Sequence, residues 1–143
     1  MPSLPVNIKF GSLGDYKLWA GDGWHHEPND KDYTWADHMA KLRIMLEYTK
    51  EDLILKVDAI PITAKNIDQE LFVFLNGSFV AHWPYRQASQ QSARIEASLL
   101  KGRESLFTFV SPKALCPKTE GLGADERTLG LAFRSISLSA AQS

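Results

Sequence analysis

The stretch LFVFLNGSFVAHW constrains the fold of this chain more than any other segment. Asn76 and Gly77 stand between two apolar runs, and both residue types tolerate the positive φ angles of a two-residue type I′ turn. The stretch therefore predicts a β-hairpin in which residues 71–75 pair with residues 79–83. Pro84 is expected to end the second strand, because proline has no backbone N–H to donate to a ladder.

Apolar and polar residues alternate through much of the remaining chain, and this pattern is typical of half-buried β-strands. Within residues 129–138 the apolar residues change from one alternate set of positions to the other, which indicates a β-bulge or a strand that crosses between sheets. The strands expected outside the hairpin cover residues 6–10, 16–19, 53–60, 93–99, 104–110 and 129–138.

The segment 36–48 fits two structures. Its apolar residues fall at helical spacing, but from Leu42 to Leu46 they also alternate as in a strand. We favour a strand that begins at Lys41 and runs to residue 48, because the other patterned segments of the chain are β.

Together these segments predict an all-β fold, an antiparallel β-sandwich of jelly-roll-like topology with about eight or nine strands. Residues 1–138 are expected to form a single domain, and residues 139–143 a frayed tail. Two long connections, residues 21–38 and 111–128, interrupt the short turns. Connections of this length without regular structure are uncommon in compact domains and often bind ligands. Function is therefore expected in these two loops.

Composition excludes several classes of function. The net charge is −1 and no basic stripe is visible, so nucleic acid is not expected as a partner. No stretch of about 18 apolar residues predicts a membrane span, and the N-terminus does not resemble a signal peptide. Cys116 is the only cysteine, which precludes an intrachain disulfide and favours a reducing, cytoplasmic location.

Catalytic and metal chemistry find little support in the spacing of the residues. His25 and His26 are adjacent, and in an extended segment they point to opposite faces. No metal or other cofactor is therefore expected. Cys116 is predicted to be a buried, inert thiol, because nothing nearby in the sequence lowers its pKa. A sugar-modifying enzyme that uses His25, His26, Glu27 or His38 as acid, base or metal ligand stays open as an alternative.

Aromatic residues are concentrated near loops and strand ends, and they suit sugar binding. Sugar rings present apolar C–H faces that lie against aromatic planes, while polar neighbours bind the hydroxyls. Trp24 and Trp35 are expected to face mainly the core, with exposure of either one to a ligand as the alternative. The aromatic residues of this group are Trp19, Trp24, Tyr33, Trp35, Trp83 and Tyr85.

Asp125 and Arg127 stand two positions apart in an extended loop, so their side chains point the same way. This spacing favours an ion pair that pins the loop. The alternative is a bidentate contact between Arg127 and an acidic sugar or a carboxylate of a partner.

Several short motifs are shared with a known group of proteins. They are Gly23-Trp24, Glu27-Pro28, Trp35, Asn76-Gly77, Ser111-Pro112, Asp125, Arg127 and Leu129-Gly130-Leu131. Through them the chain, from about residue 21 to residue 138, resembles a β-sandwich accessory domain of bacterial surface-polysaccharide systems. Such domains are often fused to glycosyltransferases or encoded beside them. The resemblance implies a non-catalytic role in glycan assembly or recognition.

The predicted function is thus non-catalytic binding of carbohydrate, or support of a glycosyltransferase, in bacterial polysaccharide metabolism. The expected partner is a carbohydrate or a glycosyltransferase, with homodimerisation through edge strands as a further expectation. The alternatives are the sugar-modifying enzyme and a protein–protein scaffold. The predicted ligand-binding residues are Trp24, His25, Glu27, Trp35, Asp125 and Arg127.

Overall fold

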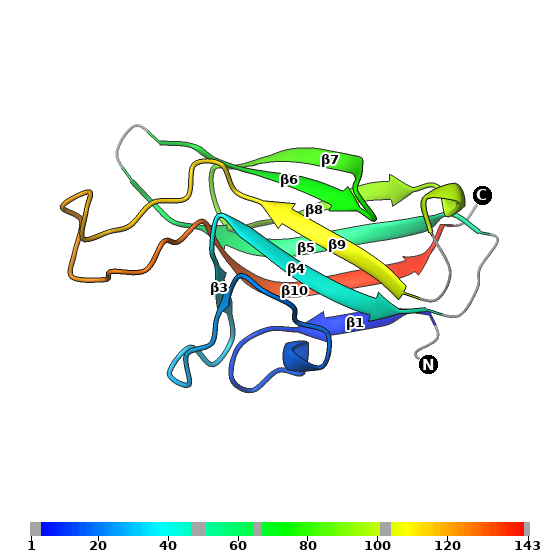
Figure 1. Cartoon of the computed structure of the whole chain (residues 1–143), viewed down its shortest axis with the longest axis horizontal. Helices are drawn as coiled ribbons and strands as arrows, with labels where there is room; N and C mark the ends of the chain where they lie inside the picture. The colour runs from blue at the N-terminus through cyan, green and yellow to red at the C-terminus, as the bar shows by residue number, and fades with distance from the viewer. Residues whose placement is uncertain (1–3, 47–50, 65–66, 101–103, 142–143) are drawn as a thin grey trace.

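The computed structural model describes residues 4–46, 51–64, 67–100 and 104–141, and within them it forms two antiparallel β-sheets. Figure 1 shows the smaller sheet lying over the larger one. The six-stranded sheet contains β1 (Val6–Lys9), β2 (Trp24–His25), β3 (Thr34–Ala36), β5 (Leu53–Pro61), β8 (Ser89–Ile95) and β10 (Leu131–Ala140). The four-stranded sheet contains β4 (Met39–Met45), β6 (Gln69–Leu75), β7 (Ser78–Tyr85) and β9 (Glu104–Val110). These findings confirm the predicted antiparallel β-sandwich.

The core lies between the sheets because each strand buries alternate residues. In β5, Leu55 and Val57 are fully buried, whereas Lys56 between them is exposed. A side-chain hydrogen bond also joins the two layers, since the Tyr85 hydroxyl on β7 donates to the Val57 carbonyl at 2.9 Å. The sandwich is therefore held by apolar burial and by at least one polar link across it.

The predicted hairpin is confirmed, and its strands are longer than expected. Asn76 and Gly77 both have positive φ angles, 51° and 85°, as a type I′ turn requires. Pro84 does not end the second strand, because β7 continues to Tyr85 and Pro84 pairs with Glu70 of β6. β7 is an edge strand of its sheet, and proline is tolerated at an edge.

β4 confirms the strand over the helical alternative, although it begins at Met39, before the predicted Lys41. The predicted extension to residue 48 falls partly on residues 47–50, outside the described residues. In β10 the change of apolar parity corresponds to a register shift between Phe133 and Ser135, which confirms the bulge. β10 also continues through Ala140, into the segment expected to be a frayed tail.

Two predicted strands are wrong in whole or in part. Residues 16–19 instead contain a short 3-10 helix, η1 (Tyr16–Leu18). The strand predicted for residues 93–99 stops at Ile95, and a second 3-10 helix, η2 (Ala97–Leu99), follows it. The reason for the second change is a side chain, because the Asp52 carboxylate accepts the Ala97 N–H at 2.9 Å and draws the backbone out of the ladder.

The two long connections differ in structure. Residues 21–38 include β2 and β3, which extend the six-stranded sheet, so the expectation of an irregular loop is wrong there. Residues 111–128 contain no named strand and project from one end of the sandwich (orange in Figure 1). The start of β1 and the end of β10 lie at the opposite end. None of the described residues belongs to a helix long and apolar enough to span a bilayer.

Candidate functional site

β3 presents one row of side chains to the outside of the six-stranded sheet. Thr34 and Ala36 are buried, whereas Tyr33, Trp35 and Asp37 are half-buried on the opposite side, as the period of two requires. The rings of Tyr33 and Trp35 meet edge to face, with centroids 6.2 Å apart. These two rings form an aromatic corner on the outer face of the sheet.

The neighbours of Trp35 come from distant parts of the chain. In the register of the sheet Trp35 lies opposite His25 of β2 and Ala132 of β10. His25 in turn reaches the second long connection, because its Nε2 lies 2.9 Å from the Thr128 carbonyl oxygen. A carbonyl can only accept, so Nε2 carries the proton. Residues 111–128 therefore return to the same face as β3.

Asp125 and Arg127 form the ion pair predicted from their spacing. The guanidinium donates from Nε to Asp125 Oδ1 at 3.0 Å and from Nη2 to Oδ2 at 2.8 Å. The Arg127 backbone N–H also donates to Oδ1, at 2.9 Å. These hydrogen bonds lower the pKa of Asp125 to about 2. The pair closes the loop on itself and holds the guanidinium in one orientation.

Arg127 also lies within an acidic environment. The hydrogen bonds to Asp125 raise the pKa of Arg127, and the nearby charges of Asp30 and Glu27 act in the same direction. Burial raises the pKa of Tyr33, and the Asp30 carboxylate contributes to this shift by its charge and by a hydrogen bond. These interactions place Tyr33 and Arg127 in one electrostatic cluster. We call the side chains of His25, Tyr33, Trp35, Asp125 and Arg127 the Trp35 surface.

Trp24 points away from this surface into the core. Its side chain is buried at 7% exposure, and its ring packs against Phe10 and Phe133, with centroids 4.9 and 5.0 Å away. Its Nε1 donates to the Lys41 carbonyl at 2.8 Å. The expectation that Trp24 faces the core is confirmed, and the ligand contact predicted for it does not fit its position. The same expectation is wrong for Trp35, because β3 turns its buried side, Thr34 and Ala36, to the core and places Trp35 on the other side.

Glu27 lines a different pocket. This pocket has a volume of about 220 Å³. Its lining residues are Ser12, Tyr16, Lys17, His26, Glu27 and Pro28. His26 Nδ1 lies 2.5 Å from the Tyr16 hydroxyl oxygen, and burial followed by the Lys17 charge lowers the His26 pKa. The structure thus separates Glu27 from the Trp35 surface, although its charge still reaches Arg127.

Among the histidines proposed for the alternative enzyme, His25 and His38 both lie beside the Asp37 carboxylate, with His25 Nε2 3.3 Å from Asp37 Oδ2, whereas His26 has a different partner. His25 bonds Thr128 and His26 bonds Tyr16, while His38 Nδ1 lies 2.7 Å from Asp37 Oδ1. No group of three or more His, Cys, Asp or Glu residues suited to hold a metal ion occurs in the part of the chain that the structure describes.

Cys116 differs from its prediction. It is half-buried, and hydrogen bonds with Thr119 lower its pKa, so local groups do act on the thiol.

Sequence reasoning also left Tyr33 and Asp30 out of the predicted site. Tyr33 was detectable in principle, because it stands two positions before Trp35 and must share its face if the segment is a strand.

The fold, unlike the sequence, is similar to that of known proteins. No protein-family model and no curated protein matches the sequence. Among solved structures, the chain is similar to the CBM36-1 domain of a multidomain xylanase from the hindgut metagenome of Trinervitermes trinervoides, at 8% identity and a TM-score of 0.56, covering 97% of this chain and 99% of that one. It is also similar to the C-terminal CBM6 of LamC, a laminarinase from Zobellia galactanivorans, at 7% identity and a TM-score of 0.53, covering 94% of this chain and 98% of that one.

A third similar structure is the GH26-CBM35 β-(1,4)-mannanase of Podospora anserina, at 13% identity and a TM-score of 0.56. The alignment covers 97% of this chain and 28% of the mannanase, so the present chain corresponds to a small part of that enzyme. At these identities the likeness establishes the fold. The chain has the β-sandwich architecture found in carbohydrate-binding modules.

Proposed function

We propose that the protein binds carbohydrate without catalysing a reaction, and that the Trp35 surface is the binding site. The observation that carries the proposal is the pair of half-buried rings of Tyr33 and Trp35 on the outer face of β3, beside the Asp125–Arg127 pair. A sugar ring can lie with its C–H face on an aromatic plane while adjacent polar groups bind its hydroxyls.

The polar groups of the Trp35 surface differ in the hydrogen bonds that they can offer to a ligand. Arg127 uses Nε and one Nη2 hydrogen to bind Asp125. A guanidinium has five N–H donors, so donors remain for a ligand hydroxyl or carboxylate. Asp125 serves as the positioning group, because its two oxygens fix the plane of the guanidinium. The Tyr33 hydroxyl adds a further group beside Trp35.

The state of the carboxylate supports a binding role over an acid–base one. A general acid must hold its proton near neutral pH, and enzymes raise the pKa of such carboxyls. Asp125 is shifted in the other direction, to about 2, by its hydrogen bonds with Arg127. It therefore remains an acceptor at physiological pH. The fold shared with carbohydrate-binding modules is consistent with the same role.

The proposal is tested by calorimetric titration with xylan, mannan and laminarin oligosaccharides, followed by a broader glycan array. With the oligosaccharide that binds, Trp35→Ala should weaken binding about tenfold or more, or about 1.4 kcal/mol. Phe79→Ala is the matched control, because Phe79 is an aromatic residue with 57% exposure on the four-stranded sheet. Its removal should leave binding unchanged.

Circular dichroism and thermal unfolding must show that both variants remain folded. Equal weakening of sugar binding by Trp35→Ala and Phe79→Ala would show that the sugar does not bind at the Trp35 surface. Failure of the wild-type protein to bind any sugar on the array would overturn the proposal.

The narrower role, support of a glycosyltransferase in bacterial polysaccharide metabolism, rests on the sequence resemblance. Co-purification of the tagged chain with a glycosyltransferase from its own host would support it, and an unchanged host polysaccharide after deletion of the gene would count against it. Dimerisation through edge strands is a separate expectation that sedimentation of the purified chain tests.

A further inference from the structure

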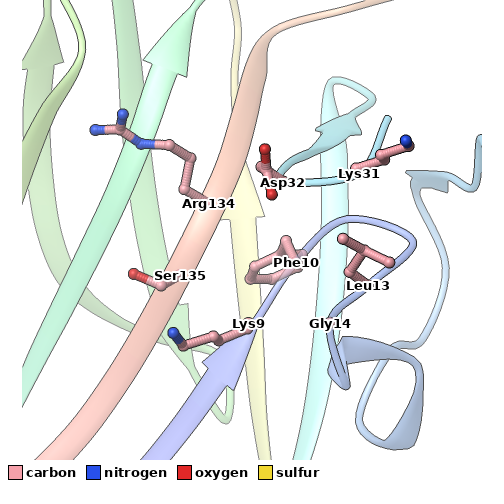
Figure 2. Close-up of a pocket in the computed structure, with 8 residues that line it drawn as sticks. All are labelled: Lys9, Phe10, Leu13, Gly14, Lys31, Asp32, Arg134 and Ser135. Carbon is pink, nitrogen blue, oxygen red and sulfur yellow. The ribbon is translucent and has the colours of Figure 1, made fainter. Parts of the chain in front are cut away.

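A second pocket, with a volume of about 300 Å³, opens where β1 meets β10 (Figure 2). It shares no residue with the Trp35 surface. Figure 2 shows the lining side chains arranged around the Phe10 ring, with Lys9 and Ser135 on one side and Leu13 on the other. The lining residues are Lys9, Phe10, Leu13, Gly14, Lys31, Asp32, Arg134 and Ser135.

The walls of this pocket are fixed by backbone hydrogen bonds. The Phe10 N–H donates to the Arg134 carbonyl at 3.0 Å, and the Leu13 N–H donates to the Lys31 carbonyl at 3.3 Å. Gly14 allows the turn to close over β1, because a Cβ at this position would lie 2.1 Å from the Lys9 carbonyl oxygen. The buried Phe10 ring supports the wall from within. The pocket is therefore largely formed before any ligand arrives, as binding sites for small molecules usually are.

Positive charge predominates in the pocket. Three of its side chains, Lys9, Lys31 and Arg134, are cationic, against the single carboxylate of Asp32. The charge of Arg134 is balanced by Asp58, a residue that does not line the pocket, because Arg134 Nε donates to Asp58 Oδ1 at 3.0 Å. Within the described residues no ion pair or side-chain hydrogen bond engages the ammonium groups of Lys9 and Lys31. Such uncompensated cations around one pocket favour an anion.

The remaining groups suit a sugar ring. Leu13 has 77% exposure and offers an apolar surface at the rim. The carboxylate of Asp32 and the hydroxyl of Ser135 can bind ligand hydroxyls, because the first accepts and the second both donates and accepts. A volume of about 300 Å³ is at the lower end for ligand sites, and it fits one sugar unit better than several.

We propose that this pocket binds an anionic sugar unit, one that bears a carboxylate or a sulfate ester, with Lys9 and Lys31 as the anion-binding residues. Arg134 contributes to the positive field and is oriented by Asp58. The inference rests on the proposed carbohydrate-binding function and adds a preference for acidic glycans. The Trp35 surface and this pocket would then contact different units of one acidic polysaccharide.

The test is a titration with oligogalacturonate, a sulfated galactan oligosaccharide and a neutral oligosaccharide that the wild-type protein binds. The doubly substituted variant Lys9→Gln/Lys31→Gln should lose about tenfold or more in affinity for one of the acidic ligands. Its affinity for the neutral ligand should stay the same. The acidic ligand that responds identifies the anion as carboxylate or sulfate. Wild-type binding of this ligand should also weaken as ionic strength rises from about 0.01 M to about 1 M.

Lys56→Gln/Lys17→Gln is the matched control, since it removes the same charge from two exposed lysines that do not line this pocket. Loss of acidic-ligand binding in both double variants would show a general charge effect and overturn the proposal. Binding of the neutral ligand but of neither acidic ligand by the wild-type protein would also overturn this proposal. That result would leave the proposed carbohydrate-binding function intact. If no oligosaccharide binds, both proposals fail. In every other case the Trp35→Ala variant, which changes only the Trp35 surface, shows which part of the affinity comes from that surface and which from the pocket.

Discussion

At the residue scale, Trp24 and Trp35 show how position within a short strand decides the role of a side chain. They lie in β2 and β3, two strands that pair with each other. Trp24 faces the core with 7% exposure, and its partner Ala36 is also buried. Trp35 pairs with His25 on the outer face, where both are half-buried. Trp24 therefore stabilises the core, whereas Trp35 is partly exposed on the outer face of the sheet.

Trp24→Ala should lower the free energy of unfolding by about 3–5 kcal/mol, because it leaves a cavity among Phe10 and Phe133 and removes the Nε1 hydrogen bond. Trp35→Ala should cost less than about 2 kcal/mol, since its side chain is only half-buried. Urea unfolding followed by circular dichroism measures both values. Equal losses would contradict the assignment of Trp24 to the core and Trp35 to the surface.

Asp125 gives a second prediction at this scale. Its folded-state pKa of about 2 lies below the ordinary value of 3.8, so its contribution to stability is present above about pH 4 and is lost as the pH falls towards 2. Asp125→Asn should reduce stability at pH 7 by about 0.5–1 kcal/mol, a modest value because the pair is about one-third exposed. The variant should also lose stability less steeply below pH 4.

Asp68→Asn is the control for this measurement. Asp68 pairs with Arg86 at 3.9 Å, and both side chains are more than 70% exposed. Its replacement should change stability very little at any pH. If the two variants have the same pH profile, the hydrogen bonds of Arg127 do not stabilise the folded state.

At the scale of the element, two glycines with similar backbone angles play different parts. Gly77 closes the hairpin at a φ of 85°, and a Cβ at this position would meet nothing within 4 Å. Gly23 precedes β2 at a φ of 95°, and a Cβ there would lie 1.9 Å from the Met39 carbonyl oxygen. The turn needs the positive φ alone, whereas the approach of β2 to β4 also needs the missing side chain.

Gly77→Ala should therefore cost about 1–2 kcal/mol, the strain of a left-handed alanine. Gly23→Ala should cost at least about 3 kcal/mol, because the backbone of β4 must move as well. Thermal unfolding of the two variants checks the order. A smaller loss for Gly23→Ala than for Gly77→Ala would show that the contact with Met39 is not rigid.

Asn76 has a further role in the same element. Beyond its φ of 51°, its side chain donates to the Leu99 carbonyl at 3.1 Å and accepts the Leu106 N–H at 2.9 Å. It thus ties the hairpin to η2 and to β9. These bonds add to the backbone pairing of β6 with β9, which joins the hairpin to the sheet.

At the scale of the whole molecule, the sandwich depends on contact between its two sheets. The Tyr85 hydroxyl reaches from β7 to the Val57 carbonyl of β5. Burial raises the pKa of Tyr85 well above its ordinary value, so the hydroxyl keeps its proton and remains a donor. The bond crosses a core that is otherwise almost entirely apolar.

Tyr85→Phe should reduce the free energy of unfolding by about 1–3 kcal/mol, because it removes a buried hydrogen bond and keeps the ring. Tyr33→Phe is the matched control, since its hydroxyl lies on the outer face, and it should change stability by less than about 1 kcal/mol. Denaturant unfolding compares the two. An equal effect would show that the link between the sheets contributes no more than a surface hydroxyl.

The scale of an interaction also explains which parts of the fold were predictable. The hairpin and the bulge of β10 were predicted because both depend on residues adjacent in the chain. η1 and η2 were missed because short-range backbone hydrogen bonds, such as Trp19 N–H to the Tyr16 carbonyl, replace the strand there. At η2 the hydrogen bond between Asp52 and Ala97 also joins residues 45 positions apart, which no local pattern reveals. β2 and β3 were missed because two or three residues are too few to display a period.

By itself the sequence determined the alternation of each longer strand, the turn at Asn76-Gly77 and the ion pair of Asp125 with Arg127. Each of these is a local consequence of backbone geometry. Only the tertiary structure decided that His25, the sheet partner of Trp35, meets the 111–128 connection and that Lys9 lies beside Ser135 in one pocket. Those meetings follow from the order of strands within each sheet. That order depends on how the whole chain buries its apolar side chains, which no short segment specifies.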